Sequence, residues 1–327
     1  MTNRKSLVGA FSAACAAALF AFTSPLQAQE NGELVYMTPG LDLAFWRYVS
    51  EGVKSVAEEN GYGFAALDST NDPQTQLQNA QDAIARGVSG IVLSPTDSST
   101  APAVLQLAQD AGIPVVIADI GTDSGEFVSV IGSNNYEGAS GVGEALASAM
   151  QEAGKTEATV GIVGISQARL NGQARTKGFK DAMADGGVVG DAGLQQMQAY
   201  TADETFKFTQ DMITANPDMG GMFIQTDGPT LGALRAIKAA RMDGDVLVAA
   251  FDGIPEFVPL LQSGELVVSG MQQPYLMGVR SAEAMLEHLD GGTPDKEITV
   301  PILIVTSDNI DGMLPTIRET VFANEIE

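Results

Sequence analysis

An alternation of short apolar runs with longer segments of helical periodicity constrains the fold of this chain more than any other feature of its sequence. After the first apolar run, Trp46, Val49, Val53 and Val56 recur at three- and four-residue spacings, as one face of a helix requires. Strands that alternate with helices in this way are typical of parallel sheets with crossover helices. The strands predicted in the first half of the chain are Glu33–Thr38, Phe64–Asp68, Gly90–Ser94, Pro114–Asp119 and Val128–Gly132.

The same alternation returns in the second half of the chain. The predicted strands contain few polar residues, which indicates sheets that are covered on both faces. We therefore predict an α/β fold with two doubly wound parallel-sheet lobes. The second set comprises the strands Thr159–Gly164, Met222–Gln225 and Val246–Phe251 and the helices Gly172–Ala184, Asp203–Ala215 and Pro229–Arg241.

Three predicted elements then remain near the end of the chain. They are a strand at Leu266–Met271, a helix at Pro274–Leu289 and a strand at Ile298–Val305. These are too few for a third domain, so we expect the chain to cross back and complete the two lobes.

The N-terminus has the pattern of a secretory signal peptide. Arg4 and Lys5 precede an apolar run from Leu7 to Phe22. Ala28, which follows shortly after this run, is a small residue of the kind found at signal-peptide cleavage sites. The run is shorter than the roughly 20 residues that span a bilayer. We predict a signal peptide over residues 1–28, cleavage after Ala28 and a periplasmic mature protein. Cys15 lies within the apolar run, so no cysteine remains after cleavage.

Composition excludes several classes of function. The chain has 17 Lys and Arg against 41 Asp and Glu, a net charge of −24, which repels nucleic acid. Its one histidine, His288, lies in a helical pattern and is expected on a solvated face. With one histidine and no mature cysteine, an imidazole or thiolate metal site is excluded, and we predict no metal and no cofactor.

Polar and aromatic residues gather where the predicted strands end. In open parallel sheets, ligands bind beyond the carboxyl ends of the strands. Taken singly, Asp119, Asp227 and Asp252 could be turn or N-cap residues, Phe45 and Trp46 core residues, and Arg175 an ion-pair partner. Together they favour a ligand site. The predicted ligand-binding residues are Asp42, Phe45, Trp46, Ser94, Asp119, Asn171, Arg175, Thr226, Asp252 and Gln272.

This mixture of side chains suits a polyhydroxylated ligand. Neighbouring hydroxyls donate to carboxylates and accept from amide or guanidinium groups, while the C–H faces of a sugar pack on aromatic rings. Arg175 opens a predicted helix and could present its planar fork to two adjacent oxygens. The residues therefore predict an uncharged sugar or polyol as ligand.

The chain resembles the periplasmic ribose-binding-protein family, the type I sugar-binding proteins of ABC importers, from about Leu34 to Ser307. Its specific matches are the Phe45-Trp46 pair followed by Gly52, Ser94-Pro95-Thr96-Asp97-Ser98, Gly112-Ile113-Pro114-Val115-Val116 with Asp119, Arg175-Thr176-Lys177-Gly178-Phe179, Leu231-Gly232-Ala233-Leu234-Arg235-Ala236 and Phe251-Asp252-Gly253.

The resemblance implies roles for several of these residues. Phe45 and Trp46 would flank the ligand ring, Asp119, Asp252 and Gln272 would bond its hydroxyls, and Arg175 would grip the ring or anomeric oxygens. It also implies a monomeric binding protein without catalytic activity, which would capture a small sugar or polyol in a closing cleft. Its partner would be the membrane permease of an ABC importer.

The chain departs from the ribose-binding pattern at four positions. Leu43, Ser94 and Thr226 stand where ribose binders typically have Asn, and Ile120 stands where they have Arg. Shortened or missing hydrogen-bonding groups would leave ribose hydroxyls unpaired, so a different pentose, a hexose, an inositol or a linear polyol stays open.

The resemblance further implies three crossings between the lobes, near Ser133, Gln272 and Leu303. The first lobe would comprise residues 33–132 and 273–302. The second would comprise residues 133–272 and 303–327.

Two rival functions lack their sequence signatures. A dinucleotide-binding dehydrogenase requires a glycine-rich turn after the first strand, where Pro39-Gly40-Leu41-Asp42 stands instead, and Gly141-Val142-Gly143 lies within a predicted helix. A transcriptional effector domain requires a DNA-reading helix pair ahead of the first strand, where the export signal lies. A periplasmic protein that reports a sugar-like signal to a membrane receptor would use the same fold and site, and this alternative stays open.

Overall fold

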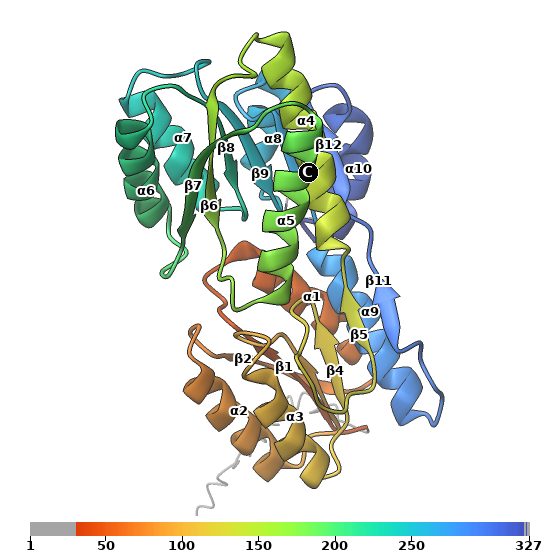
Figure 1. The fold of residues 1–327 in the computed structure, drawn as a ribbon. Helices are drawn as coiled ribbons and strands as arrows, with labels where there is room; N and C mark the ends of the chain where they lie inside the picture. Colours follow the sequence, from red (N-terminus) through yellow and green to blue (C-terminus); the bar gives the residue numbers. More distant parts are fainter. Residues whose placement is uncertain (1–30, 324, 326–327) are drawn as a thin grey trace, which may run out of the picture.

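The computed structural model describes residues 31–323 and 325, and the predicted signal peptide lies outside them. The chain forms two lobes, each built on a six-stranded sheet with helices on both faces (Figure 1). The predicted fold class of two doubly wound α/β lobes is confirmed.

The first lobe has strands in the order β11-β5-β4-β3-β1-β2, all parallel. Helices α1 and α9 cover one face of this sheet, and α2 and α3 cover the other. The strands are β1 (Glu33–Thr38), β2 (Gly63–Asp68), β3 (Gly90–Leu93), β4 (Val115–Ala118), β5 (Val130–Gly132) and β11 (Glu297–Thr299), and the helices are α1 (Ala44–Glu59), α2 (Pro73–Arg86), α3 (Ala101–Asp110) and α9 (Pro274–Leu289).

Two glycines allow α1 and α9 to lie in close contact. A Cβ atom at Gly52 would overlap the carbonyl oxygen of Tyr275, and one at Gly278 would overlap that of Val49. Only glycine leaves room for backbones this close. Helix α9 is thereby fixed beside the helix that carries Phe45 and Trp46.

The second lobe has strands in the order β12-β10-β9-β8-β6-β7. Helices α4 and α5 cover one face, and α6, α7, α8 and α10 cover the other. The strands are β6 (Thr159–Gly164), β7 (Gly190–Gln196), β8 (Met219–Ile224), β9 (Leu247–Phe251), β10 (Val268–Met271) and β12 (Leu303–Thr306), and the helices are α4 (Asn135–Glu152), α5 (Leu170–Asp185), α6 (Ala202–Ala215), α7 (Thr230–Ala239), α8 (Phe257–Ser263) and α10 (Ile310–Thr320).

Three features of the strands differ from the sequence-based expectations. The single strand expected at Ile298–Val305 is wrong: β11 and β12 belong to different sheets, and Pro301 lies between them, where it has no amide hydrogen for a ladder. β12 also pairs antiparallel with β10, so the second sheet is not wholly parallel. Strand β7 was not predicted, because its sequence GDAGLQQ carries little apolar signal.

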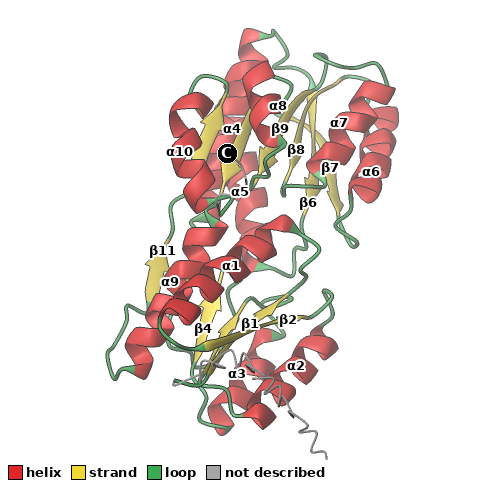
Figure 2. Cartoon of the chain, turned by 180° about the vertical axis from the view of Figure 1, so that it is seen from behind, coloured by secondary structure: helices red, strands yellow, loops and turns green. Residues whose placement is uncertain are grey.

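The chain passes between the two sheets three times: after β5, after β10 and between β11 and β12. Figure 2 shows the last of these crossings as the loop that leads from β11 to the second lobe. β5, β11 and β12 lie at or next to one edge of their sheets, whereas β2 and β7 form the opposite edges. The crossings are therefore gathered on one side of the molecule, and the loops after β2 and β7 lie on the other.

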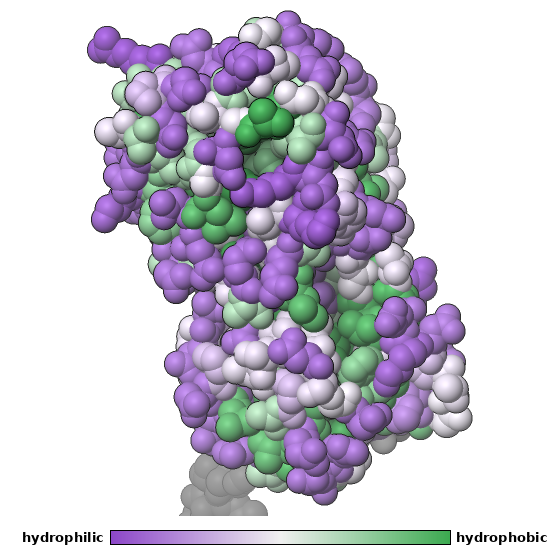
Figure 3. Space-filling view, in the orientation of Figure 1, coloured by the Kyte–Doolittle hydropathy of each residue, from purple (hydrophilic) through white to green (hydrophobic). Residues whose placement is uncertain are grey.

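Hydrophilic residues predominate on the face shown in Figure 3, in keeping with the net charge of −24. His288 is exposed, as predicted. Within the described residues, no helix has both the length and the apolar character needed to cross a membrane.

Candidate functional site

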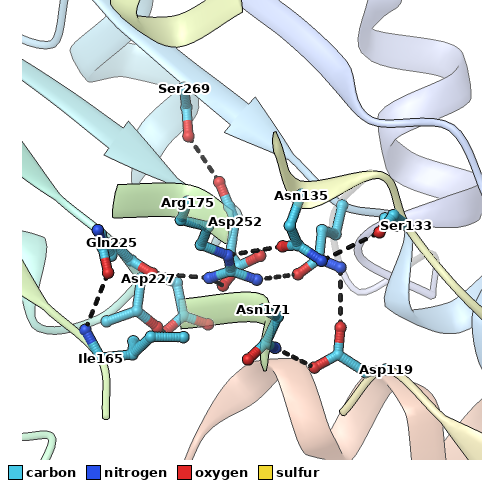
Figure 4. A network of polar contacts seen from close by, with 12 residues as sticks. Asp119, Ser133, Asn135, Ile165, Asn171, Arg175, Gln225, Asp227, Asp252 and Ser269 are labelled. Atoms are coloured by element: carbon cyan, nitrogen blue, oxygen red, sulfur yellow. Dashed lines mark hydrogen bonds and ion pairs between the residues drawn. The ribbon is translucent and has the colours of Figure 1, made fainter. Parts of the chain in front are cut away.

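Five of the ten predicted site residues form one hydrogen-bonded network where the lobes meet (Figure 4). They are Asp119, Asn171, Arg175, Asp252 and Gln272. Asp119 follows β4 of the first sheet, while Asp252 and Gln272 follow β9 and β10 of the second. The carboxyl ends of strands from both lobes thus contribute to one site, as expected for parallel α/β sheets.

Arg175 lies at the centre of this network and is only 2% exposed. Its Nε donates to Asn135 Oδ1 at 2.7 Å, and its Nη1 donates to the carbonyl oxygen of Gln225 at 2.7 Å and to Asp252 Oδ2 at 3.2 Å. Its Nη2 donates to Gln272 Oε1. The guanidinium carbon lies 4.0 Å from the centre of the Phe251 ring. All of these contacts come from the second lobe, so the cation is oriented without the help of a first-lobe group.

Asp119 joins the first lobe to the network. Its Oδ2 accepts from Asn171 Nδ2 at 3.0 Å, and its Oδ1 accepts from Gln272 Nε2 at 2.9 Å. Burial raises the pKa of this carboxyl group, and the nearby charge of Arg175 opposes the rise. One carboxylate therefore binds groups on both the second lobe and the crossing segment.

Asp119 and Asp252 share an unusual backbone conformation. Their φ angles are +66° and +63°, in the left-handed region where Asp is among the few tolerated residues. Such strain clusters at ligand sites, where it directs a side chain toward its target. Burial raises the pKa of Asp252 to about 7, and the charge of Arg175 opposes the rise.

Three buried oxygen atoms at this site have no hydrogen-bond donor among the described residues. They are Asn171 Oδ1, Asp227 Oδ2 and Asp252 Oδ1. All three are acceptors, and a buried acceptor without a donor is costly. The site therefore lacks hydrogen-bond donors, which the hydroxyl groups of a ligand could supply.

A cavity of about 510 Å³ lies beside the network between the two lobes. The loops after β1 and β2 line it from the first lobe, and Arg169 with residues 198–200 lines it from the second. Of the predicted residues, Trp46 and Asp42 line this cavity. Phe45 packs edge-on against Trp46, with ring centres 4.7 Å apart.

Ser94 and Thr226 make local contacts instead of joining the network. The Ser94 hydroxyl lies 3.0 Å from that of Tyr36 inside the first lobe. Thr226 Oγ1 lies 3.4 Å from Asp227 Oδ1. Ser94 directly follows β3 and Thr226 lies two residues after β8, so both are at carboxyl strand ends as predicted. Both are buried, and their hydroxyls are engaged within their own lobes.

The structure also brings in four residues outside the ten predicted ligand-binding residues, and of these only Asp227 is among the strand-end candidates that the sequence indicates. Asn135 orients Arg175, Asp227 contributes an unpaired acceptor, and Arg169 and Tyr200 line the cavity. Arg169 follows β6, so a complete reading of strand ends could have found it. Tyr200 follows β7, the strand that was not predicted. Among the described residues, no group of three His, Cys, Asp or Glu side chains could hold a metal ion.

Comparison with known proteins identifies the family. A model of the periplasmic binding protein domain matches residues 34–293. The ribose import binding protein of Escherichia coli is 30% identical over 303 residues, covering 93% of this chain and 99% of that protein.

Two solved structures share the fold. A protein from Mycobacterium smegmatis in complex with β-D-fucofuranose superposes with a TM-score of 0.81 at 21% identity, over 89% of this chain and 96% of that one. A periplasmic solute-binding protein of an ABC transporter from Actinobacillus succinogenes, with bound D-allose, has a TM-score of 0.79 at 21% identity, over 86% of this chain and 99% of that one. From the matched family model and the full-length similarity to a ribose import binding protein, this chain belongs to the periplasmic binding protein family, among its ribose-binding-like members.

Proposed function

We propose that this protein is the substrate-binding protein of an ABC importer and captures a small uncharged sugar or polyol between its two lobes. The observation that carries this proposal is the set of three buried acceptors without donors, on Asn171, Asp227 and Asp252, around an oriented Arg175. A polyol offers several hydroxyl donors to such acceptors and hydroxyl oxygens to a guanidinium.

The charges at the site favour an uncharged ligand. Asp119, Asp227 and Asp252 are buried there, and Arg175 already pairs with Asp252 at 3.2 Å. An anionic ligand would meet carboxylates in a medium of low dielectric constant, where repulsion is strong. The names of the relatives, which are import and transport proteins, support import over the signalling alternative.

The first-lobe side of the site supports a ligand other than ribose. Ser94 stands where ribose binders have Asn, and its hydroxyl is engaged by Tyr36. Ile120 stands where they have Arg and is fully buried. Fewer first-lobe donors are therefore available than a ribose site requires, so a sugar or polyol with a different hydroxyl pattern is expected.

We further propose lobe boundaries at residues 33–132 with 273–302 and 133–272 with 303–327. The pairing of β5 with β11, and of β10 with β12, supports this division. Ligand binding would close the lobes about the three crossings, because groups from both lobes must contact the ligand together. The protein would act as a monomer without catalytic activity, in the periplasm, after cleavage behind Ala28.

A thermal-shift screen tests the function. The mature protein is screened against a panel of aldopentoses, hexoses, inositols and alditols, and hits are measured by calorimetry. A ligand at about 100 times its dissociation constant adds nearly 3 kcal/mol to the free energy of unfolding. We expect at least one dissociation constant of micromolar order, about −8 kcal/mol. If no member of the panel stabilises the protein, the proposed function is wrong.

A further inference from the structure

A second arginine, Arg169, crosses the cleft from the second lobe to the first. It precedes α5 and is 5% exposed. Its Nε donates to the carbonyl oxygen of Thr96 at 2.9 Å, and its Nη2 donates to Asn71 Oδ1 at 2.9 Å. The next residue, Leu170, donates its amide hydrogen to Ser98 Oγ at 3.2 Å. Three hydrogen bonds from two adjacent residues therefore join the lobes.

The Arg169 guanidinium is buried without a carboxylate partner. No Asp or Glu oxygen among the described residues lies within 4.0 Å of it, whereas Arg175 has Asp252. Burial lowers its pKa. The Tyr200 ring, in its own lobe, lies 5.2 Å from the guanidinium carbon. A buried cation needs compensating contacts. The bonds from Arg169 to the first lobe supply them, and these bonds exist only while the lobes are closed.

The turn that receives Arg169 is strained. Thr70 and Asn71 have φ angles of +48° and +54°, a conformation that is rare for a β-branched residue such as Thr. Asp68 holds the turn, since its Oδ1 accepts from the Thr70 amide at 2.7 Å and its Oδ2 from the Leu41 amide at 3.2 Å. The first lobe thus fixes the backbone that carries Asn71, as strained turns at ligand clamps do.

The contact between Arg169 and Asn71 lies on the side of the cleft that is remote from the crossings. Asn71 follows β2, at the opposite edge of its sheet from β5 and β11 (Figure 1). Arg169 and Asn71 both line the cavity at this side. When lobes rotate about a hinge, the surfaces farthest from the hinge separate most, so bonds here are broken by opening whereas bonds near the crossings need not be.

We propose that Arg169 is a positioning residue for ligand retention: through Thr96 and Asn71 it holds the lobes together over the bound ligand. This inference rests on the proposed function. The bonds form after the ligand has entered, so they slow dissociation and leave association nearly unchanged.

Stopped-flow kinetics test this with the panel member that binds the unaltered protein most tightly. Arg169→Ala should raise the dissociation rate about tenfold, as expected for losing two hydrogen bonds of the closed state, with an association rate within about threefold of wild type. Arg169→Lys should recover only part of the loss, because an ammonium lacks the planar fork that spans both acceptors. Arg235→Ala is the matched control, since Arg235 forms an exposed ion pair with Asp203 at 2.9 Å within the second lobe.

Asn71→Ala supplies an independent arm that does not depend on the folding of an Arg169 variant. It should raise the dissociation rate in the same direction, and the double variant should be no faster than Arg169→Ala alone, because both remove one shared contact. An unchanged dissociation rate in both single variants, or fully additive effects in the double variant, would overturn the inference. The proposed function would still stand in that case, because the unaltered protein binds the ligand. If the unaltered protein binds no member of the panel, the proposed function fails first and this inference with it.

Discussion

The second lobe and the first lobe contribute unequally to the site. The second lobe provides a bonded cluster around Arg175, in which Asn135, Gln225, Asp252 and Gln272 each accept one of its hydrogen bonds. The first lobe adds one carboxylate to this cluster, Asp119, together with the aromatic pair on α1. In the proposed site, the second lobe would therefore supply a preorganised half-site, which the first lobe would complete on closing.

The largest effect is therefore expected in the second lobe. Arg175→Ala should abolish measurable binding and lower the free energy of unfolding by about 3 kcal/mol, because it leaves Asp252 buried without its cation. Chemical denaturation and calorimetry measure both effects. Lys180→Ala on the same helix, whose ion pair with Asp191 is exposed, serves as the control. If the Arg175 variant binds like wild type, the second lobe does not carry the half-site.

A smaller effect is expected from the first lobe. Asp119→Ala should weaken binding by about 1 to 3 kcal/mol, since it removes one acceptor but leaves the Arg175 cluster intact. The nearby exposed Asp123, varied in the same way, should change affinity little. A loss at Asp119 as large as that at Arg175 would contradict the unequal contributions of the two lobes.

The second lobe should also make binding depend on pH. Burial raises the pKa of Asp252 to about 7. Ligand hydroxyls donate to the charged carboxylate, so binding favours the deprotonated form, and affinity should be complete above pH 7 and fall by up to about tenfold per pH unit below it. The ligand-free protein should behave oppositely: the folded state holds this proton more tightly, so its free energy of unfolding should fall as the pH rises from about 4 to about 7.

Calorimetry across this pH range tests the linkage. Asp252→Asn should reduce the pH dependence even where it weakens binding overall, because an amide does not titrate. A pH dependence that is unchanged in this variant would assign the titration to another group.

The architecture could be predicted from periodicity because buried parallel strands and amphipathic helices leave clear patterns. The errors arose where that signal is weak or ambiguous. Strand β7 carries polar residues at the edge of its sheet, and β11 and β12 read as one apolar run although they belong to separate lobes. No local pattern records which sheet a short strand joins.

The site could be predicted in part for a related reason. Strand ends indicate which residues lie near a cleft, and this brought Asp119, Asp252 and Gln272 into the prediction. Strand ends do not indicate which of those side chains are already hydrogen-bonded to another residue of the protein. Ser94 is bonded to Tyr36, a partner 58 residues away in sequence, and Arg169 reaches Asn71 over 98 residues. The Ser94–Tyr36 bond forms once the first lobe has folded, whereas the Arg169–Asn71 bond exists only when both lobes are folded and in contact.

The smallest effect is expected at Asp42, on the first-lobe rim of the cavity. The residue lines that cavity, but it is exposed, and its side chain has no contact with the Arg175 cluster among the bonds of the described structure. Its carbonyl oxygen, which accepts from Arg47 Nη1 at 2.9 Å, is unaffected by a side-chain change. A hydrogen bond from an exposed carboxylate to a ligand hydroxyl replaces a bond to water, so its net contribution is small. Asp42→Ala should therefore weaken binding by about 0.5 kcal/mol or less, which calorimetry resolves as roughly a twofold change in dissociation constant. A loss comparable to that of Asp119→Ala would mean that Asp42 is desolvated over the ligand and replaces the polarity missing at Leu43, and the first lobe would then contribute to the site more equally than the structure indicates.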